Sequence, residues 1–305
     1  MQHKPVFSLR TLWLAALLPV IGMGLLTSCG DDQPAQPTTE APAFDPEGMG
    51  DASRTNTIKQ IFYAAPSPME TAALVQRSGA QFDKKHMHPT ASRTRYTTSD
   101  RQAVALGVYG ADLSYATIFE ENSVSLEYLT AVKELSKSLG ISDVLNEEVM
   151  ARAEANRGDR DALVQIVSET FTSLNEALKE NGMEDLSAML VLGGWVEGVY
   201  LATQHVNQAP TELKARIAEQ KLTLDDVMRL CRSYEPTPEL TALVASMAPV
   251  EAAFAQVQVT EAEGFAEQSA DGGFVVGGGD EITASDATLK AIASAIQNVR
   301  TQWVK

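Results

Sequence analysis

Two long stretches of this chain carry a single charged side chain each. Residues 102–119 contain Asp112 as their only charge, and residues 186–211 contain Glu197 as their only formal charge. A helix that is apolar on nearly all of its sides is buried inside a larger array of helices. Neither stretch is expected to cross a bilayer, because an acid at the centre of a membrane costs about 2.5–3.5 kcal/mol. The chain must therefore supply other helices to surround these two.

The rest of the chain has the pattern of such helices. Apolar residues recur with helical spacing, polar capping residues precede the apolar stripes, and glycines follow them. Short connections between roughly ten helices indicate an all-α fold, an irregular antiparallel multi-helix bundle. Residues 80–97 are polar and basic and predict a long loop, and Pro249 should kink or break the helix around it. We expect helices over residues 67–78, 98–119, 123–139, 142–156, 159–180, 183–206, 211–220, 223–234, 237–257 and 285–303.

A glycine-rich segment interrupts the helical pattern near the end of the chain. Residues 263–283 include the run DGGFVVGGGDE at 271–281. A phosphate-binding loop ends in G-K-[ST] and follows a strand, and neither feature is present here. The segment therefore predicts a glycine-rich loop or a short hairpin around residues 274–276.

The first residues have the three parts of an export signal. Lys4 and Arg10 form a basic start, residues 11–26 carry no charge, and small residues lead to Cys29. The apolar run is shorter than the roughly 20 residues that span a bilayer. The run LTSC at 26–29 resembles the lipobox of bacterial lipoprotein signal peptides. The resemblance implies that residues 1–28 are removed and that Cys29 carries the lipid. The alternative is an ordinary secretory signal with a chance cysteine, but such signals end in an A-x-A-like site, which is absent here.

Residues 29–54 are expected to be a lipidated cysteine and a disordered tether. This segment has four prolines and few large apolar groups, so burial of its side chains cannot offset the entropy lost on ordering. Residues 55–305 are then expected to form a single all-α domain. In Gram-negative lipoproteins, an aspartate after the cysteine often retains the protein at the inner membrane, and Gly30 stands there in this chain. The resemblance therefore implies a protein anchored in the cell envelope at the outer membrane, with the leaflet left open.

The charge of the chain restricts its partners. The full chain has a formal net charge of −16, and removal of residues 1–28 takes away two basic residues and no acid. Binding to nucleic acid depends on Lys and Arg contacts with phosphates, so nucleic acid is excluded as a partner. An envelope protein or a small cationic or sugar-like ligand fits this charge better. Beyond Cys29 the only cysteine is Cys231, which lies in an amphipathic stretch and is expected to be a buried, inert thiol.

Aromatic residues accompany both isolated acids at helical spacing. Three candidate outcomes follow, because a buried carboxylate must be paired, hydrogen-bonded or protonated. The acids could be purely structural, they could line a ligand pocket with their aromatic neighbours, or they could work as a general acid and base. Glycines beside them would let another helix or a ligand approach closely. The candidate ligand-binding residues are Tyr109, Asp112, Tyr115, Trp195, Glu197 and Tyr200.

No other motif suggests chemistry. His86 and His88 lie in a basic loop without a cluster of acids or cysteines, so we expect no metal and no cofactor. The segments at 66–80, 109–115 and 193–201 resemble uncharacterised all-helical lipoproteins of Gram-negative envelopes. Together these observations predict a lipid-anchored envelope protein that is a non-catalytic binding or scaffolding module. The alternative is an envelope hydrolase that uses Asp112 and Glu197 as an acid/base pair.

Overall fold

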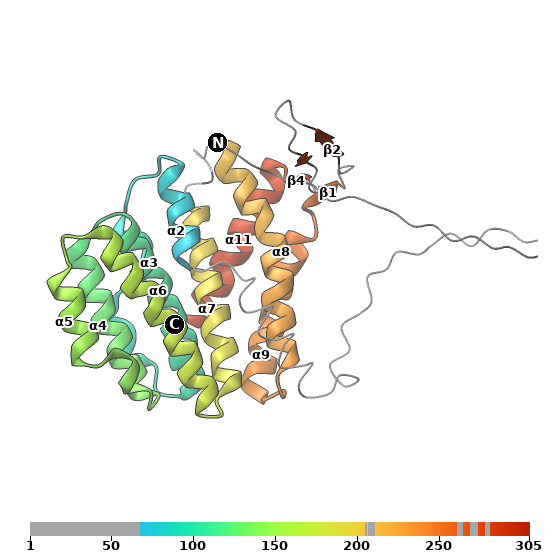
Figure 1. Ribbon diagram of the computed structural model, residues 1–305. Helices are drawn as coiled ribbons and strands as arrows, with labels where there is room; N and C mark the ends of the chain where they lie inside the picture. Colours follow the sequence, from blue (N-terminus) through green and yellow to red (C-terminus); the bar gives the residue numbers. More distant parts are fainter. Residues whose placement is uncertain (1–67, 205, 207–210, 261–264, 269–273, 278–280) are drawn as a thin grey trace, which may run out of the picture. The chain divides into compact units, whose positions relative to one another are not determined.

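The amphipathic stretches do form helices, and several of them are connected by short turns as expected of a bundle (Figure 1). The computed structural model describes residues 68–204, 206, 211–260, 265–268, 274–277 and 281–305. The predicted signal peptide, Cys29 and the tether lie outside these residues. All of the described elements belong to one compact unit, Phe44–Lys305.

The described part of the chain is all-α, as predicted, and contains ten α-helices and three short 3-10 helices. Their caps are the ones that the sequence offers: the Asp159 side chain accepts a hydrogen bond from the Ala162 amide, and Ser285 caps the last helix in the same way. The α-helices are α2 (Pro68–Arg77), α3 (Ser99–Ile118), α4 (Asn122–Ser138), α5 (Glu147–Ala155), α6 (Arg160–Glu180), α7 (Glu184–Thr203), α8 (Thr211–Ser233), α9 (Pro238–Ser246), α10 (Ala248–Phe254) and α11 (Asp286–Trp303), and the 3-10 helices are η2 (Lys84–His86), η3 (Thr90–Arg95) and η4 (Ser142–Leu145).

Two helix boundaries differ from the predictions. Residues 211–220 and 223–234 were expected to form separate helices, but α8 runs through both. No glycine or proline interrupts it there, and the buried residues Gln220, Thr223 and Leu224 continue one face. The expected helix over 142–156 is instead divided into η4 and α5. Asn146 divides it, because its side chain accepts hydrogen bonds from the Glu148 and Val149 amides and caps a new helix.

The two predicted interruptions near the end of the chain are confirmed. α9 ends at Ser246 and α10 begins at Ala248, with Pro249 in its first turn, where proline is tolerated. Around the glycine-rich segment, β1 (Gln258–Thr260) pairs antiparallel with β4 (Glu281–Thr283), and β2 (Phe265–Gln268) pairs antiparallel with β3 (Phe274–Gly277). The segment is thus a pair of short antiparallel ladders within an otherwise helical fold.

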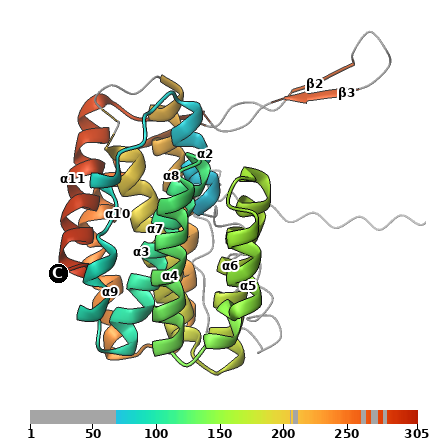
Figure 2. The same cartoon turned by 90° about the vertical axis from the view of Figure 1, so that its left-hand side faces the viewer.

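The two stretches with one acid each become the central helix pair, α3 and α7, which lie between α11 on one side and α5 and α6 on the other (Figure 2). Glycines let their backbones touch. A Cβ atom on Gly107 would lie 2.0 Å from the Leu190 carbonyl oxygen, and one on Gly193 would lie 2.4 Å from that of Val104. The sequence predicted that glycines beside the acids would let a helix or a ligand approach closely. At Gly193 the neighbour is the backbone of helix α3.

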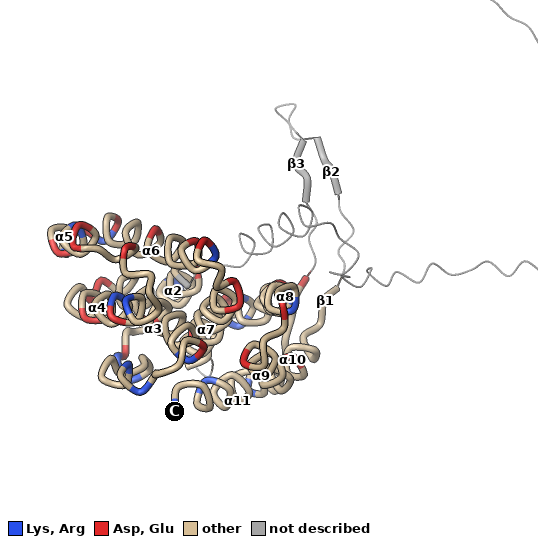
Figure 3. Tube along the Cα trace, turned by 90° about the horizontal axis from the view of Figure 1, so that it is seen from below, with Lys and Arg blue, Asp and Glu red and all other residues tan. Residues whose placement is uncertain are grey.

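Charged residues gather away from this pair, with both signs present along α4, α5 and α6 (Figure 3). α7 is long and apolar enough to span a membrane by length and composition, and its apolar window is wholly buried inside the bundle. All of its residues from Leu186 to Thr203 are buried. In this fold, α7 is the core helix that its sequence predicts.

Candidate functional site

The two isolated acids meet in the core, and an arginine joins them. Arg300, from α11, donates two hydrogen bonds to Glu197, from Nε to Oε2 at 2.5 Å and from Nη2 to Oε1 at 2.7 Å. Glu197 is 0% exposed and Arg300 is 8% exposed. The Arg300 guanidinium also lies over the ring of Tyr200, 4.0 Å from its centroid. A bidentate pair of this kind fixes the geometry of both groups.

Asp112, from α3, completes this group, which we call the acid–arginine cluster (Asp112, Glu197 and Arg300). Its Oδ2 accepts a hydrogen bond from the His88 amide at 2.9 Å, and the residue is 0% exposed. Burial raises the pKa of Asp112 well above its usual value, and the neighbouring Glu197 carboxyl, which is within hydrogen-bonding reach, raises it further. Asp112 Oδ1 accepts no hydrogen bond from the described residues, as expected of the oxygen that carries the proton of a carboxylic acid.

The cluster therefore holds two carboxyl groups and one guanidinium. Burial also raises the pKa of Glu197, but the charge and hydrogen bonds of Arg300 and the hydrogen bond from Asp112 oppose that shift. A buried charge requires a partner of opposite sign, and Arg300 supplies one positive charge. We assign the negative charge to Glu197, which holds the bidentate pair, and the proton to Asp112. The buried group is then neutral as a whole.

A loop covers the cluster and is fastened to it. This strap, residues 81–96, contains η2 and η3 and corresponds to the predicted long loop. His88 holds its centre: the backbone amide bonds Asp112, the backbone carbonyl accepts from Tyr128 Oη at 2.8 Å, and Nε2 lies 2.7 Å from Tyr96 Oη. Three hydrogen bonds at one residue, each to a different side chain, fix the strap over the core.

His88 is 5% exposed and stays neutral. Burial, together with the positive charges of Arg300 and Arg95, lowers its pKa to about 4. A neutral imidazole has one N–H and one bare ring nitrogen, so Nε2 either accepts a hydrogen bond from the Tyr96 hydroxyl or donates one to it, depending on the tautomer. The charge state and the hydrogen bond are therefore consistent with each other.

The six candidate ligand-binding residues are all buried, between 0% and 7% exposed. The tyrosines of α3 form hydrogen bonds with the strap: Tyr109 Oη donates to the Pro89 carbonyl at 2.9 Å, and Tyr115 Oη accepts from the Asp83 amide at 3.2 Å. Trp195 packs against Phe254 with ring centroids 5.9 Å apart. Asp112, Glu197 and Tyr200 meet at Arg300. Ligand binding by these residues stays a prediction, and a ligand would have to displace the strap to reach the acids.

Sequence reasoning did not identify Arg300, although its position carried a signal. The buried face of α11 comprises Leu289, Ile292 and Ile296 at helical spacing, and Arg300 continues that face four residues later. A cation on the apolar face of one helix is the expected counterpart of an isolated acid on another.

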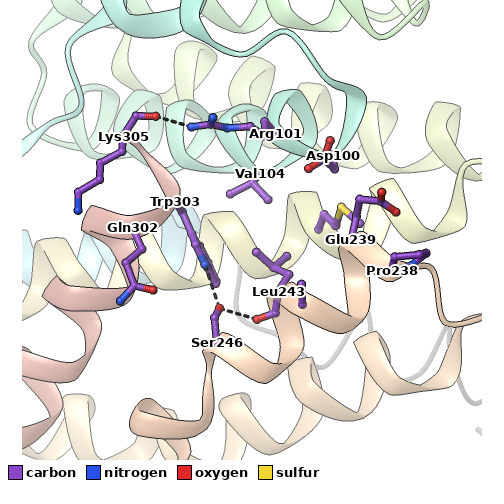
Figure 4. A pocket seen from close by; sticks show the side chains of 12 residues that line it. Asp100, Arg101, Val104, Pro238, Glu239, Leu243, Ser246, Gln302, Trp303 and Lys305 are labelled. Atoms are coloured by element: carbon purple, nitrogen blue, oxygen red, sulfur yellow. Dashed lines mark hydrogen bonds between the residues drawn. The ribbon is translucent and has the colours of Figure 1, made fainter.

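An open cleft is lined by residues of α3, α7, α9 and α11 (Figure 4). We call it the Trp303 cleft. It encloses about 650 Å³, within the range of about 300–1,000 Å³ typical of ligand sites. Trp303 Nε1 donates to Ser246 Oγ at 3.0 Å, so the indole is held in place and its ring surface is left for contact. The lining residues are Asp100, Arg101, Val104, Met189, Pro238, Glu239, Ala242, Leu243, Ser246, Gln302, Trp303 and Lys305.

Opposite charges lie at the two ends of the Trp303 cleft (Figure 4). At one end, Asp100 of α3 and Glu239 of α9 face each other across the opening, and neither forms an ion pair within the described part of the chain. At the other end, the Arg101 guanidinium donates a hydrogen bond to the Lys305 carbonyl and also lies 5.7 Å from the centroid of the Tyr96 ring. The acids are free to bind a ligand, whereas Arg101 is engaged by its own chain.

Cys231 is buried, as the sequence predicted. It is 2% exposed, and burial raises the pKa of its thiol to about 12. A protonated, buried thiol is not a nucleophile. Cys231 borders a further cleft of about 520 Å³ between α8 and α9, and a third of about 720 Å³ lies between α2 and α8.

The described residues thus contain a sealed polar cluster and an open cleft, and the two are built from different side chains of the same central helices. Of the residues described, no group of three or more His, Cys, Asp and Glu side chains is placed to hold a metal ion. Comparison with known proteins assigns neither site, because no protein-family model, no curated protein and no solved structure matches this chain.

Proposed function

We propose that this chain is a lipid-anchored protein of the bacterial cell envelope that binds a partner or ligand without turning it over. The Trp303 cleft is its binding surface. The observation that carries the proposal is a contrast: the candidate acids are sealed beneath the strap, while the Trp303 cleft is open and has free acids at one end. The anchor rests on the lipobox resemblance at Cys29, and the outer membrane is proposed from Gly30.

The bonding of the acid–arginine cluster supports a structural role for it. A catalytic acid or base must reach the proton that it transfers. Asp112 is bonded to the strap amide of His88, and Glu197 is bonded twice to Arg300. Both acids therefore already have partners within the fold, and these partners explain why two acids are kept in an apolar core.

The hydrolase alternative is supported by one observation, the convergence of the two carboxyls with a raised pKa on Asp112. It requires the strap to open. Asp112→Asn separates the two functions, because it abolishes an acid/base pair and leaves binding in the Trp303 cleft unchanged.

The anchor is tested by fractionating cells that express the full chain or Cys29→Ser. We expect the wild type in the membrane fraction, with an acylated N-terminal peptide that begins at Cys29 in mass spectra. Cys29→Ser should be unacylated, and residues 1–28 should remain attached to it. A wild-type chain without acylation would overturn the anchor and leave the Trp303 cleft untouched.

Binding is tested by thermal-shift screening of envelope-derived peptides, sugars and cationic small molecules. A compound that binds in the Trp303 cleft raises the melting temperature of the wild type, by mass action on the folded state. It should not raise that of Ala242→Phe, which fills the cleft from the exposed face of α9 without touching the core. A hit that shifts both proteins equally, or that is lost only in Asp112→Asn, would contradict binding at this surface.

A further inference from the structure

The chemistry of the Trp303 cleft indicates what it binds. Its floor is apolar, with Val104 and Leu243 beside the indole of Trp303. The indole N–H is already bonded to Ser246, so the ring offers a ligand apolar and π surface and no free donor. One part of the ligand should therefore be a large apolar group.

The acids define the other part. Asp100 and Glu239 come from two different helices and lie at the same end of the cleft, as Figure 4 shows. Each stands in the first turn of its helix, where the helix dipole favours an acid. That position explains the presence of each acid, but it does not explain why both border one apolar cavity. A cation placed between them would be attracted by both.

The opposite end carries Arg101 and Lys305, and Arg101 is engaged by its own chain. The Arg101 guanidinium donates to the Lys305 carbonyl and lies against Tyr96, so its charge is directed away from the apolar floor. The formal net charge of −16 adds a long-range attraction for cations over the whole chain. The size of the cleft, about 650 Å³, suits a few side chains and not a folded domain.

We infer that the Trp303 cleft binds a short peptide segment of a partner protein, one that carries a large apolar side chain beside a Lys or Arg. The apolar side chain lies against Trp303 and Leu243, and the cation lies between Asp100 and Glu239. This inference rests on the proposed function, and it names the class of ligand. Two features of the cleft support this inference together, the pair of acids and the fixed indole. An uncharged apolar group would contact only the indole, and a bare cation would contact only the acids.

The test is isothermal titration calorimetry with capped five-residue peptides. The full chain is used, in zwitterionic nanodiscs if it purifies with the membrane and in buffer if it does not. Four peptides of equal length pair Phe with Lys, Phe with Glu, Phe with Gln, and Ser with Lys, in a glycine background. We expect the Phe–Lys peptide to bind at least about tenfold more tightly than the other three, and added salt to weaken it.

The double variant Asp100→Asn/Glu239→Gln should weaken the Phe–Lys peptide about 3- to 20-fold, because two exposed ion pairs are lost. It should leave the Phe–Gln peptide unchanged. Asp143→Asn/Glu148→Gln is the matched control, since it removes two acids from the first turns of η4 and α5, outside the cleft. This control should bind like the wild type, and Ala242→Phe should bind none of the peptides.

Several results would overturn the inference. Equal binding of the Phe–Lys, Phe–Glu and Phe–Gln peptides, lost in Ala242→Phe, would show an apolar site without charge selection; the proposed binding function would then survive. Equal binding of the Ser–Lys peptide would show attraction by net charge alone. Binding retained in Ala242→Phe, or no heat with any peptide, would exclude this cleft as a site for basic peptides. The wider screen decides separately whether the cleft binds anything else.

Discussion

Arg300 binds Glu197 through the Nε and Nη2 atoms of its guanidinium, although the two residues lie 103 positions apart in the sequence, and Glu197 is not exposed to solvent. Asp112 sits beside this pair and accepts a hydrogen bond from the strap amide of His88, and burial raises its pKa well above the usual value. The two acids look alike in the sequence, yet only Glu197 forms a bidentate pair with the guanidinium. Substitutions that remove the charge should therefore affect them differently.

Glu197→Gln should lower the free energy of unfolding by about 3–5 kcal/mol, because it leaves Arg300 buried without a counter-charge. Asp112→Asn should change it by no more than about 1 kcal/mol, since an amide can accept from the His88 amide and donate to Glu197 as the protonated acid does. Urea unfolding measures both. Glu147→Gln is the control: its pair with Lys133 is exposed and screened by solvent, so this variant should unfold at nearly the same urea concentration as the wild type. Equal losses at Asp112 and Glu197 would mean that both acids are ionised.

His88 should make the protein less stable in mild acid. The folded protein takes up a proton at this residue only near pH 4, whereas an unfolded chain takes it up near pH 6.5. Between these values the unfolded state binds more protons, so the free energy of unfolding falls as the pH drops from 6.5 towards 4. The loss attributable to His88 is on the order of 3 kcal/mol. His88→Gln cannot titrate, and its stability should decline less over this interval in parallel urea titrations; identical slopes would place the charge change elsewhere.

The α3–α7 contact should tolerate no side chain at its glycines. Gly107→Ala places a Cβ atom 2.0 Å from the Leu190 carbonyl oxygen, and neither backbone can move without separating the central helices. We expect a loss of at least about 2–3 kcal/mol. Gly198→Ala is the matched control on α7, where the added Cβ would lie 3.6 Å from Thr71 Cγ2, an ordinary contact. That variant should gain about 0.5–1 kcal/mol from reduced backbone entropy. A stable Gly107→Ala protein would rule out the close approach of the helices.

Cys231 should be unreactive until the protein unfolds. The thiol is 2% exposed, and its pKa is raised to about 12, so little thiolate forms at neutral pH. Iodoacetamide should leave Cys231 unmodified in buffer and modify it fully in urea, as followed by the mass of its peptide. Rapid labelling of the native protein would show that α8 opens locally.

Much of the fold could be predicted from the sequence because local signals decide it. Caps such as Asp159 and Ser285 and the apolar stripes gave most of the helices, and the isolation of Asp112 and Glu197 pointed to the central pair. Residues 211–220 and 223–234 were wrongly predicted as two helices, since no glycine or proline lies between them to end the first one.

The sites were harder to predict because they depend on contacts between distant residues. Arg300 lies on the buried face of α11, but the partner that explains a cation there is Glu197 on α7, 103 positions away in the sequence. The Trp303 cleft is assembled from four helices, and each acid that borders it has the ordinary position of a first-turn acid. Asp100 and Glu239 become candidates for ligand binding only because the fold places both of them at one end of an apolar cleft.

The place of Arg300 also has a consequence for how the protein matures. α11 is the last helix of the described chain, so during synthesis α3 and α7 emerge long before the guanidinium that their acids require. Until α11 docks, a chain has two carboxyls in its interior and no counter-charge, and the strap lacks the contact of Arg300 Nη2 with the His86 carbonyl. Contacts over such long separations form late in folding. Nascent chains should therefore remain incompletely folded, and exposed to proteases, until residue 300 has joined the core.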